Sequence, residues 1–127
     1  MRIEHIALYV HDLPAAKDFF LTYFQATPND GYHNPQTGLR TYFLTFEEGA
    51  RLELMTRPML AEGAGSAPHV GYAHLAFSLG SRAAVEALTD RLRADGYAVV
   101  SDPRVTGDGY YESCVLGPED CVLELTE

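Results

Sequence analysis

Basic residues are scarce in this sequence, and long apolar runs are missing. Lysine and arginine number 9 against 18 aspartates and glutamates, which leaves a formal net charge of −9. Nucleic acids and anionic membranes bind clustered basic side chains, so neither is expected as a partner. No apolar run reaches the roughly 18 residues of a membrane-spanning helix, and the N-terminus shows no apolar signal-peptide stretch. We therefore expect a soluble, cytoplasmic protein.

Cysteine is also scarce, since only Cys114 and Cys121 are present and no C-x-x-C pair occurs. Their positions would let them lie near each other across a hairpin. Two cysteines nevertheless make no disulfide framework, and a cytoplasmic setting keeps thiols reduced. We expect both to be ordinary buried residues rather than catalytic ones.

The chain has 127 residues, of which 46% are hydrophobic. This suits one compact domain, or two very small modules that share a core. Residues 58–71 are rich in proline, glycine and alanine without any periodicity, which predicts a linker. We expect a single domain over residues 1–127, whose two modules span residues 1–57 and 72–127.

A short pattern occurs twice in the chain. The sequence His-Ile-Ala-Leu begins at His5, and His-Leu-Ala-Phe begins at His74. Each is followed by a helical stretch and then by strand-like stretches that end in Leu-Glu-Leu, around Glu53 and Glu124. The histidines are 74 − 5 = 69 residues apart, and the glutamates 124 − 53 = 71. The four residues therefore hold equivalent positions in two similar halves.

Local patterns predict the elements of each half. Asp12, followed by Pro14, and Ser81 are good N-caps for the two helices, and Pro28 ends the first of them. Alternating or β-rich composition predicts the strands. The predicted helices cover about residues 14–25 and 82–94, and the predicted strands cover residues 2–10, 39–46, 51–56, 72–79, 97–101, 110–116 and 121–126.

Loops are predicted over residues 28–38, with a short strand near Tyr32, and over residues 102–109. Counting that short strand, each half reads β-α-β-β-β, a repeated supersecondary unit of about 55 residues. Helices occur only after the first strand of each half. This order predicts an α+β fold built from two modules rather than a repeated parallel β-α-β.

The four repeated residues have metal-binding chemistry. A mid-strand glutamate between two leucines is costly if its face is buried without a partner. A lone strand histidine is usually structural, but matched recurrence in two halves suggests that His5, Glu53, His74 and Glu124 converge on one cation. Imidazole and carboxylate ligands suit a divalent transition metal. We expect nickel, cobalt or zinc, and manganese or iron is also compatible. The histidines without a counterpart, which we do not expect to be ligands, are His11, His33 and His69.

The repeated module, with histidine on its first strand and glutamate on its last, resembles the vicinal oxygen chelate superfamily. That superfamily includes glyoxalase I, fosfomycin-resistance enzymes, extradiol dioxygenases and bleomycin-resistance proteins. The resemblance covers essentially the whole chain and is greatest to the small bacterial glyoxalase I type. It implies a glyoxalase-like fold with a curved sheet around a metal site. The family's four metal ligands fall on His5, Glu53, His74 and Glu124.

The second glutamate favours glyoxalase I, because relatives with three ligands use two histidines and one glutamate. The resemblance implies a lactoylglutathione lyase, whose metal holds the hemithioacetal of methylglyoxal and glutathione, or the enediolate formed from it. The metal stabilises the enediolate charge, and a glutamate carries a proton between adjacent carbons. By analogy Glu124 is the expected base, and Glu53 shares the role. The family also implies a homodimer with a small-molecule substrate.

One position departs from the bacterial glyoxalase I pattern. Those enzymes resemble one another in an arginine, four residues after the first ligand histidine, that holds a glutathione carboxylate. Here that position is Tyr9, so another thiol adduct or a different α-hydroxycarbonyl compound remains open as substrate. The residues expected to contact substrate are Tyr9, Arg40, Arg57 and Tyr111.

Two other kinds of function remain open at this point. One is another vicinal oxygen chelate reaction, either ring-cleaving dioxygenation, which needs Fe(II) and oxygen, or thiol transfer. The other is a protein that binds an antibiotic or metabolite without catalysis. The sequence also leaves open whether the modules pair within one chain or across a dimer.

Overall fold

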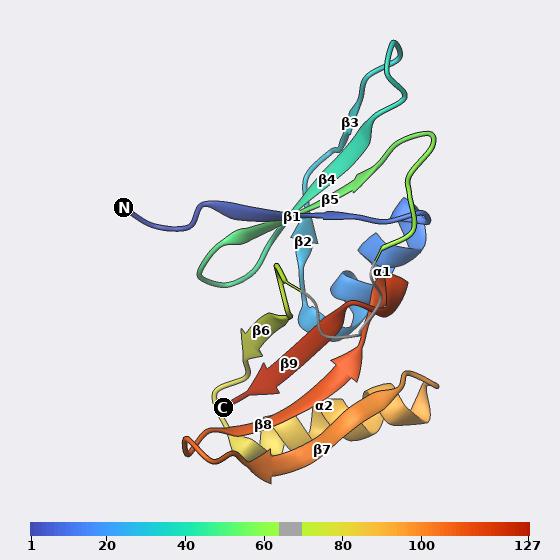
Figure 1. Cartoon of the computed structure of the whole chain (residues 1–127). Coiled ribbons are helices and arrows are strands. Elements are labelled where there is room, and N and C mark those ends of the chain that lie inside the picture. Colours follow the sequence, from blue (N-terminus) through green and yellow to red (C-terminus); the bar gives the residue numbers. More distant parts are fainter. Residues whose placement is uncertain (64–69) are drawn as a thin grey trace. The chain divides into compact units, whose positions relative to one another are not determined.

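The computed structural model describes residues 1–63 and 70–127, and the chain divides into two compact units, Met1–Glu62 and Gly63–Glu127 (Figure 1). We call these unit 1 and unit 2. Each has one α-helix and one mixed β-sheet, which confirms the predicted α+β class. The predicted linker at 58–71 includes residues 64–69, which lie outside the described residues. Neither helix of the described part is long and apolar enough to cross a membrane.

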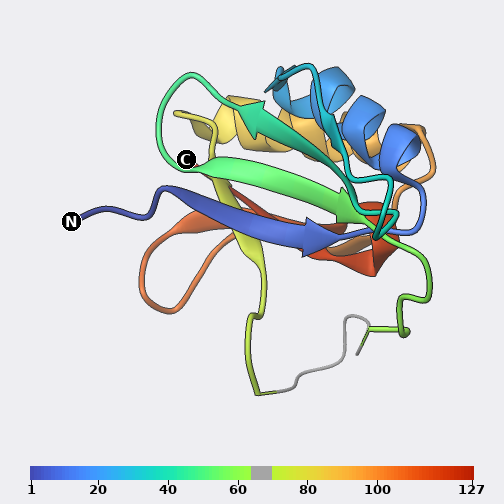
Figure 2. The same cartoon turned by 90° about the horizontal axis from the view of Figure 1, so that it is seen from above.

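Unit 1 has a sheet of five strands. Its order is β1-β5-β4-β2, and β3 also pairs with β4. Strand β1 runs parallel to β5, and the other pairs are antiparallel. Figure 2 shows β1, β5 and β4 side by side, with α1 on one face. The elements of unit 1 are β1 (His5–Tyr9), α1 (Leu13–Phe24), β2 (Thr27–Pro28), β3 (Tyr32–His33), β4 (Arg40–Thr45) and β5 (Arg51–Thr56).

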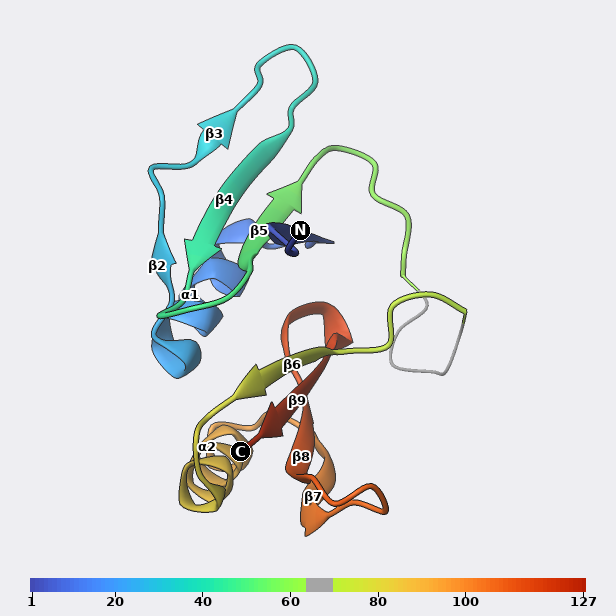
Figure 3. The ribbon, with the colours of Figure 1, turned by 90° about the vertical axis from the view of Figure 1, so that its left-hand side faces the viewer.

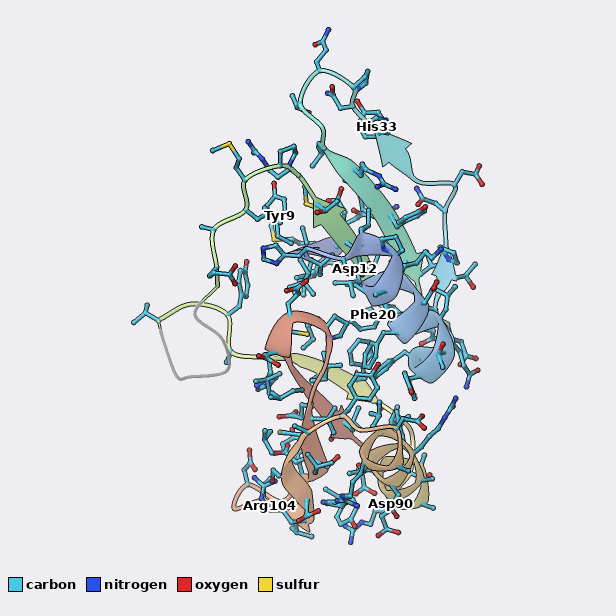
Figure 4. The ribbon with its side chains drawn as sticks, turned by 90° about the vertical axis from the view of Figure 1, so that its right-hand side faces the viewer. Tyr9, Asp12, Phe20, His33, Asp90 and Arg104 are labelled. Atoms are coloured by element: carbon cyan, nitrogen blue, oxygen red, sulfur yellow. The ribbon has the colours of Figure 1, made fainter. Side chains whose placement is uncertain are left out.

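Helix α1 begins and ends as its sequence predicts. The Asp12 carboxylate accepts a hydrogen bond of 2.9 Å from the backbone N–H of Ala15, and Pro14 lies in the first turn (Figure 4). Gln25 closes the helix with a left-handed φ of 53°. The buried face of α1 packs on the sheet, where Leu44 of β4 and Leu52 and Leu54 of β5 are buried. The core of unit 1 includes Val10, Leu13, Ala16, Phe19, Phe20, Leu44, Leu52 and Leu54.

Unit 2 has a four-stranded sheet of order β6-β9-β8-β7, in which β6 runs parallel to β9 (Figure 3). Helix α2 starts at Ser81, whose hydroxyl accepts a 3.3 Å hydrogen bond from the backbone N–H of Ala84. The elements are β6 (Leu75–Ser78), α2 (Arg82–Ala94), β7 (Val99–Val105), β8 (Tyr111–Leu116), η1 (Pro118–Asp120) and β9 (Val122–Thr126). Its core includes Val85, Thr89, Leu92, Ser113, Val115, Leu123 and Leu125.

Polar contacts join α2 to the sheet of unit 2. The Thr89 hydroxyl donates to the carbonyl of Val85 at 2.6 Å and lies 2.7 Å from the Ser113 hydroxyl, and both side chains are buried. Near the helix start, the Tyr111 hydroxyl donates to Glu86 at 2.6 Å. The Arg82 guanidinium lies 4.8 Å from the centre of the Tyr111 ring. Tyr111 therefore faces the helix.

The loop predicted over residues 102–109 is wrong at its start, because β7 continues to Val105. Pro103 lacks a backbone N–H, which normally excludes it from a central strand. β7 lies at the edge of its sheet, however, and its pairing with β8 shifts register on both sides of Ser101. An edge position with bulges tolerates proline. The structure also adds the short β2, and it starts β6 one residue after His74.

Candidate metal centre

In each unit, the histidine and glutamate of the sequence repeat form a pair of nearly the same geometry. In unit 1, Nε2 of His5 lies 3.8 Å from a carboxylate oxygen of Glu53, and the side chains are 41% and 16% exposed. In unit 2, Nε2 of His74 lies 3.4 Å from Glu124, with side chains 42% and 17% exposed. The sequence repeat thus corresponds to a repeat in side-chain geometry.

The sheet register explains both pairs. On β1 and β5, Ala7 lies opposite Glu53, and on β6 and β9, Ala76 lies opposite Glu124. The histidine precedes the alanine by two residues, so alternation puts both on the same face. The small alanine leaves room for the imidazole to reach the carboxylate. The flanking leucines face the core, which directs each glutamate to the opposite face of its sheet.

The separations suit shared coordination of a cation. Ligand atoms about 2.1 Å from a metal lie about 3.4 Å apart at a tetrahedral angle. Both pairs are near this separation, and each offers one nitrogen and one oxygen donor. Partial exposure leaves these atoms accessible. The donor chemistry therefore fits a divalent transition metal.

His5 is also held from its other ring nitrogen. Its Nδ1 lies 2.5 Å from the carboxylate of Glu4, and Glu4 accepts a 2.7 Å hydrogen bond from Nε of Arg51. The Phe43 ring packs edge-on to the imidazole at 5.3 Å, with the Arg51 guanidinium 4.2 Å from its centre. The hydrogen bond from His5, and then Arg51, lowers the pKa of Glu4. With Nδ1 occupied by Glu4, the Nε2 lone pair is free to bind a metal.

Unit 2 surrounds its pair differently. Cys114 on β8 lies directly opposite Glu124 in the register, and Glu112 lies two residues before Cys114 on the same face. The ligand atoms of Glu112, Cys114 and Glu124 all lie within 4.8 Å of one another, so this group could hold a metal ion. A guanidinium nitrogen of Arg104, on β7, lies 3.7 Å from Glu112.

Negative charge is concentrated at this end of unit 2. Partial burial raises the pKa of Glu112, and the nearby charge of Glu124 raises it further. Burial, followed by the charges of Glu124 and Glu112, also raises the pKa of Cys114. The pKa of Cys121 is raised to about 11, mainly by burial. A cation near Glu112, Cys114 and Glu124 would relieve the repulsion among them.

Sequence reasoning missed Glu112 and treated Cys114 as an ordinary residue. A signal was present, because alternation along Glu-Ser-Cys-Val puts Glu112 and Cys114 on one face and Ser113 on the other. The pairing of Cys114 with Glu124 across β8 and β9 could not be predicted from the sequence, because it depends on the turn at residues 117–121.

The residues predicted to contact substrate are scattered. Tyr9 is on the same face of β1 as His5 and is 46% exposed. Arg40 starts β4 beside His33, and alternation places it on the face opposite Phe43, the partner of Glu53. Arg57 follows the end of β5. Tyr111 faces α2, on the other side of the sheet from Glu124. Of these four residues, only Tyr9 therefore shares a strand face with a predicted ligand of its unit.

Two of the three unmatched histidines, His11 and His33, belong to neither pair. His11 has its Nε2 3.7 Å from Glu62, and His33 belongs to β3. His69 lies outside the described residues.

Comparison with known proteins gives a consistent family assignment. The sequence-family model of the Glyoxalase/Bleomycin resistance protein/Dioxygenase superfamily matches residues 2–125. The uncharacterized protein YqjT of Bacillus subtilis (strain 168) is 28% identical over 130 residues, covering 97% of this chain and 96% of YqjT.

Solved structures share the fold. One described as a possible glyoxalase from Bacillus cereus has a TM-score of 0.72 at 24% identity, covering 100% of this chain and 99% of that one. The trypanothione-dependent glyoxalase I of Leishmania major has a TM-score of 0.77 at 18% identity, covering 100% and 86%. At these identities the likeness establishes the fold alone.

Proposed function

The chain belongs to the Glyoxalase/Bleomycin resistance protein/Dioxygenase superfamily, and from this premise we propose that it is a metal-dependent lyase or isomerase of the glyoxalase I type. The observation that carries the proposal is the repeated pair: a histidine Nε2 lies 3.8 Å from a glutamate oxygen in unit 1 and 3.4 Å in unit 2. Two nitrogen and two oxygen donors make a four-ligand set. We propose that His5, Glu53, His74 and Glu124 bind one divalent ion.

Nickel, cobalt and zinc are the metals we propose, since imidazole and carboxylate ligands together suit them. When bound, such an ion supplies Lewis-acid polarisation of substrate oxygens and stabilises negative charge that develops on them. We also propose that the protein works as a homodimer, as the superfamily resemblance implies. The two pairs of a site would come from one chain or from two copies, and either arrangement supplies the same four ligands.

The proposed substrate is a hemithioacetal or a related α-hydroxycarbonyl compound. Glu124 removes the proton from the hydroxyl-bearing carbon as a general base, and the substrate passes through an enediolate. The proton then returns to the adjacent carbon from the same carboxyl group, while the hydroxyl proton moves to the neighbouring oxygen. The reaction is an isomerisation, so no oxidant or co-reactant is consumed. Glu53 holds the equivalent position in unit 1 and shares the proton transfer.

The carboxylates are suited to this work by their setting. Glu53 and Glu124 are about one-sixth exposed, with side chains 16% and 17% accessible. Their partial burial limits the contact of both carboxylates with bulk water. His5 and His74 border them, and the apolar Phe43 ring packs edge-on to His5 in unit 1.

The test combines metal analysis with turnover. Purified protein is loaded with nickel, cobalt or zinc, and bound metal is measured for the wild type, Glu53→Ala, His74→Ala and the control Glu48→Ala, which removes an exposed charge of unit 1. We expect both ligand variants to bind metal more weakly than the wild type, and the control to bind it as the wild type does. Metal binding by both ligand variants at wild-type affinity would overturn the proposed site.

Turnover is then assayed on adducts of methylglyoxal with several thiols. We expect Glu124→Gln to lower kcat at least about a hundredfold, the scale of general acid–base catalysis. If metal-loaded wild-type protein turns over none of the adducts, the lyase assignment fails. Oxygen uptake with Fe(II), thiol consumption, or ligand binding without turnover would then identify the dioxygenase, transferase or binding-protein alternative.

A further inference from the structure

The two histidine–glutamate pairs differ in what lies across the neighbouring strand. On the antiparallel neighbour in unit 1, Phe43 is opposite Glu53. On the matching neighbour in unit 2, Cys114 is opposite Glu124. Phenylalanine offers no donor, whereas cysteine offers sulfur, a soft ligand for zinc and cobalt. The repeated geometry therefore has one chemically unequal position.

The unequal position lies within ligand distance of Glu124, the carboxylate of the pair. Ligand atoms of Glu112, Cys114 and Glu124 are mutually within 4.8 Å, so this group could hold a metal ion. The His74 nitrogen is 3.4 Å from the Glu124 carboxylate. Among the described residues no other group of three such side chains gathers in this way.

Strand alternation keeps these donors away from the core. On β8, Ser113 and Val115 are fully buried against the helix side, so Cys114 points to the other face. The Arg104 guanidinium lies 3.7 Å from Glu112 and also donates a 2.5 Å hydrogen bond to the Ser101 hydroxyl, and its side chain is half-exposed. One exposed arginine offsets little of the repulsion between two carboxylates. A divalent cation held between them would offset far more.

We propose that Cys114 is a thiolate ligand of the metal, with Glu112 as a further oxygen donor beside His74 and Glu124. The inference rests on the proposed function, because it takes His74 and Glu124 as metal ligands. On binding, the Cys114 S–H bond breaks, its proton leaves to solvent, and a sulfur–metal bond forms. The thiolate makes the centre selective for zinc or cobalt over magnesium, manganese and calcium, which prefer oxygen ligands.

The same four residues give unit 2 a donor set of its own. Unit 1 offers His5 and Glu53 without a sulfur donor at the equivalent place. The proposal therefore predicts that removing the unit 1 ligands weakens metal binding less than removing those of unit 2. It also predicts that the bound metal contacts sulfur.

Cobalt(II) is the probe, because a cobalt–thiolate bond produces a charge-transfer band in the near ultraviolet that nitrogen and oxygen ligands do not. Full-length protein is loaded with cobalt, its cobalt content is measured by elemental analysis, and its absorption spectrum is recorded. We expect the band in wild-type protein. Cys114→Ser should abolish the band and raise the cobalt dissociation constant at least about tenfold. Removing a residue that only hydrogen-bonds to a metal ligand already weakens metal binding by that factor.

Cys121→Ser is the matched control. Cys121 is the residue before β9 and lies two positions before the buried Leu123. Strand alternation therefore places it on the core side of the sheet. This variant should keep the band. Cys114→Ala serves as a second variant if Cys114→Ser fails to fold, and circular dichroism checks each protein. In wild-type protein, bound cobalt should also slow alkylation of Cys114.

The outcomes separate the inference from the proposed function. Cobalt bound without the band, or a band that survives in Cys114→Ser, would overturn the cysteine ligand and leave the four-residue centre standing. Absence of bound cobalt from wild-type protein would overturn both. A band that persists in cobalt-loaded Glu53→Ala supports the inference, because the cobalt–thiolate bond then forms without the unit 1 glutamate.

Discussion

Glu4 should control metal affinity through His5, although it is not expected to touch the metal. Its carboxylate lies 2.5 Å from Nδ1 of His5, and Arg51 holds it from the other side. This contact keeps the proton on Nδ1 and directs Nε2 toward Glu53. The change to make is Glu4→Ala, which removes the acceptor and leaves the imidazole free to rotate and to change tautomer.

The expected size of the effect follows from the exposure of the contact. Losing the hydrogen-bond partner of a ligating histidine typically lowers metal affinity by about 10- to 100-fold. Glu4 is 52% exposed and His5 is 41% exposed, so water replaces part of the lost interaction. We therefore expect a dissociation constant about tenfold higher, at the lower end of that range. Glu4→Gln keeps a carbonyl acceptor and should fall between Glu4→Ala and the wild type.

The assay is a competition titration with a chromophoric chelator at fixed pH. Glu48→Ala provides the control, because it removes one exposed carboxylate from the same unit without touching His5. Raising the salt concentration should change the control and wild type alike. If Glu4→Ala binds metal within twofold of the wild type while His5→Ala binds far more weakly, the orienting role of Glu4 is refuted.

Three further predictions concern stability and ionisation. Thr89→Val should lower the free energy of unfolding by about 1–3 kcal/mol, because it leaves the buried Ser113 hydroxyl without its partner. Chemical denaturation should show that adding Ser113→Ala to this variant restores most of the lost stability. If the effects of the two substitutions simply add, the explanation is wrong. The pKa of Tyr111 is raised, first by its hydrogen bond to Glu86, so the bond contributes stability that is present below the unfolded-state pKa and is lost as pH rises through the folded-state pKa. Tyrosinate absorbance should show that Glu86→Gln lowers this pKa, and an unchanged titration would count against the bond. Metal at 100 times its dissociation constant should add about 2.7 kcal/mol to the unfolding free energy, a gain that a chelator reverses and that His5→Ala lacks.

Most of the element pattern could be predicted from the sequence, because it depends on neighbours a few residues apart. Capping at Asp12 and Ser81 and the strand from Arg51 to Thr56 follow from local chemistry, and they occur as predicted. The strand through Pro103 was predicted as loop, since local rules disfavour proline there. Only its place at the sheet edge, paired with β8 alone, makes that conformation acceptable.

The repeat of histidine and glutamate was also readable, since it is a matter of residue type and spacing. By itself the sequence determined which four residues are candidates and which strand face Glu53 and Glu124 occupy, because alternation with buried leucines is a local property. The tertiary structure decided what surrounds them. Pairing of β8 with β9 brings Cys114 and Glu112 beside Glu124, and pairing of β1 with β5 brings Arg51 to Glu4. Those contacts join residues distant in the sequence, and only the strand register can bring them within bonding distance.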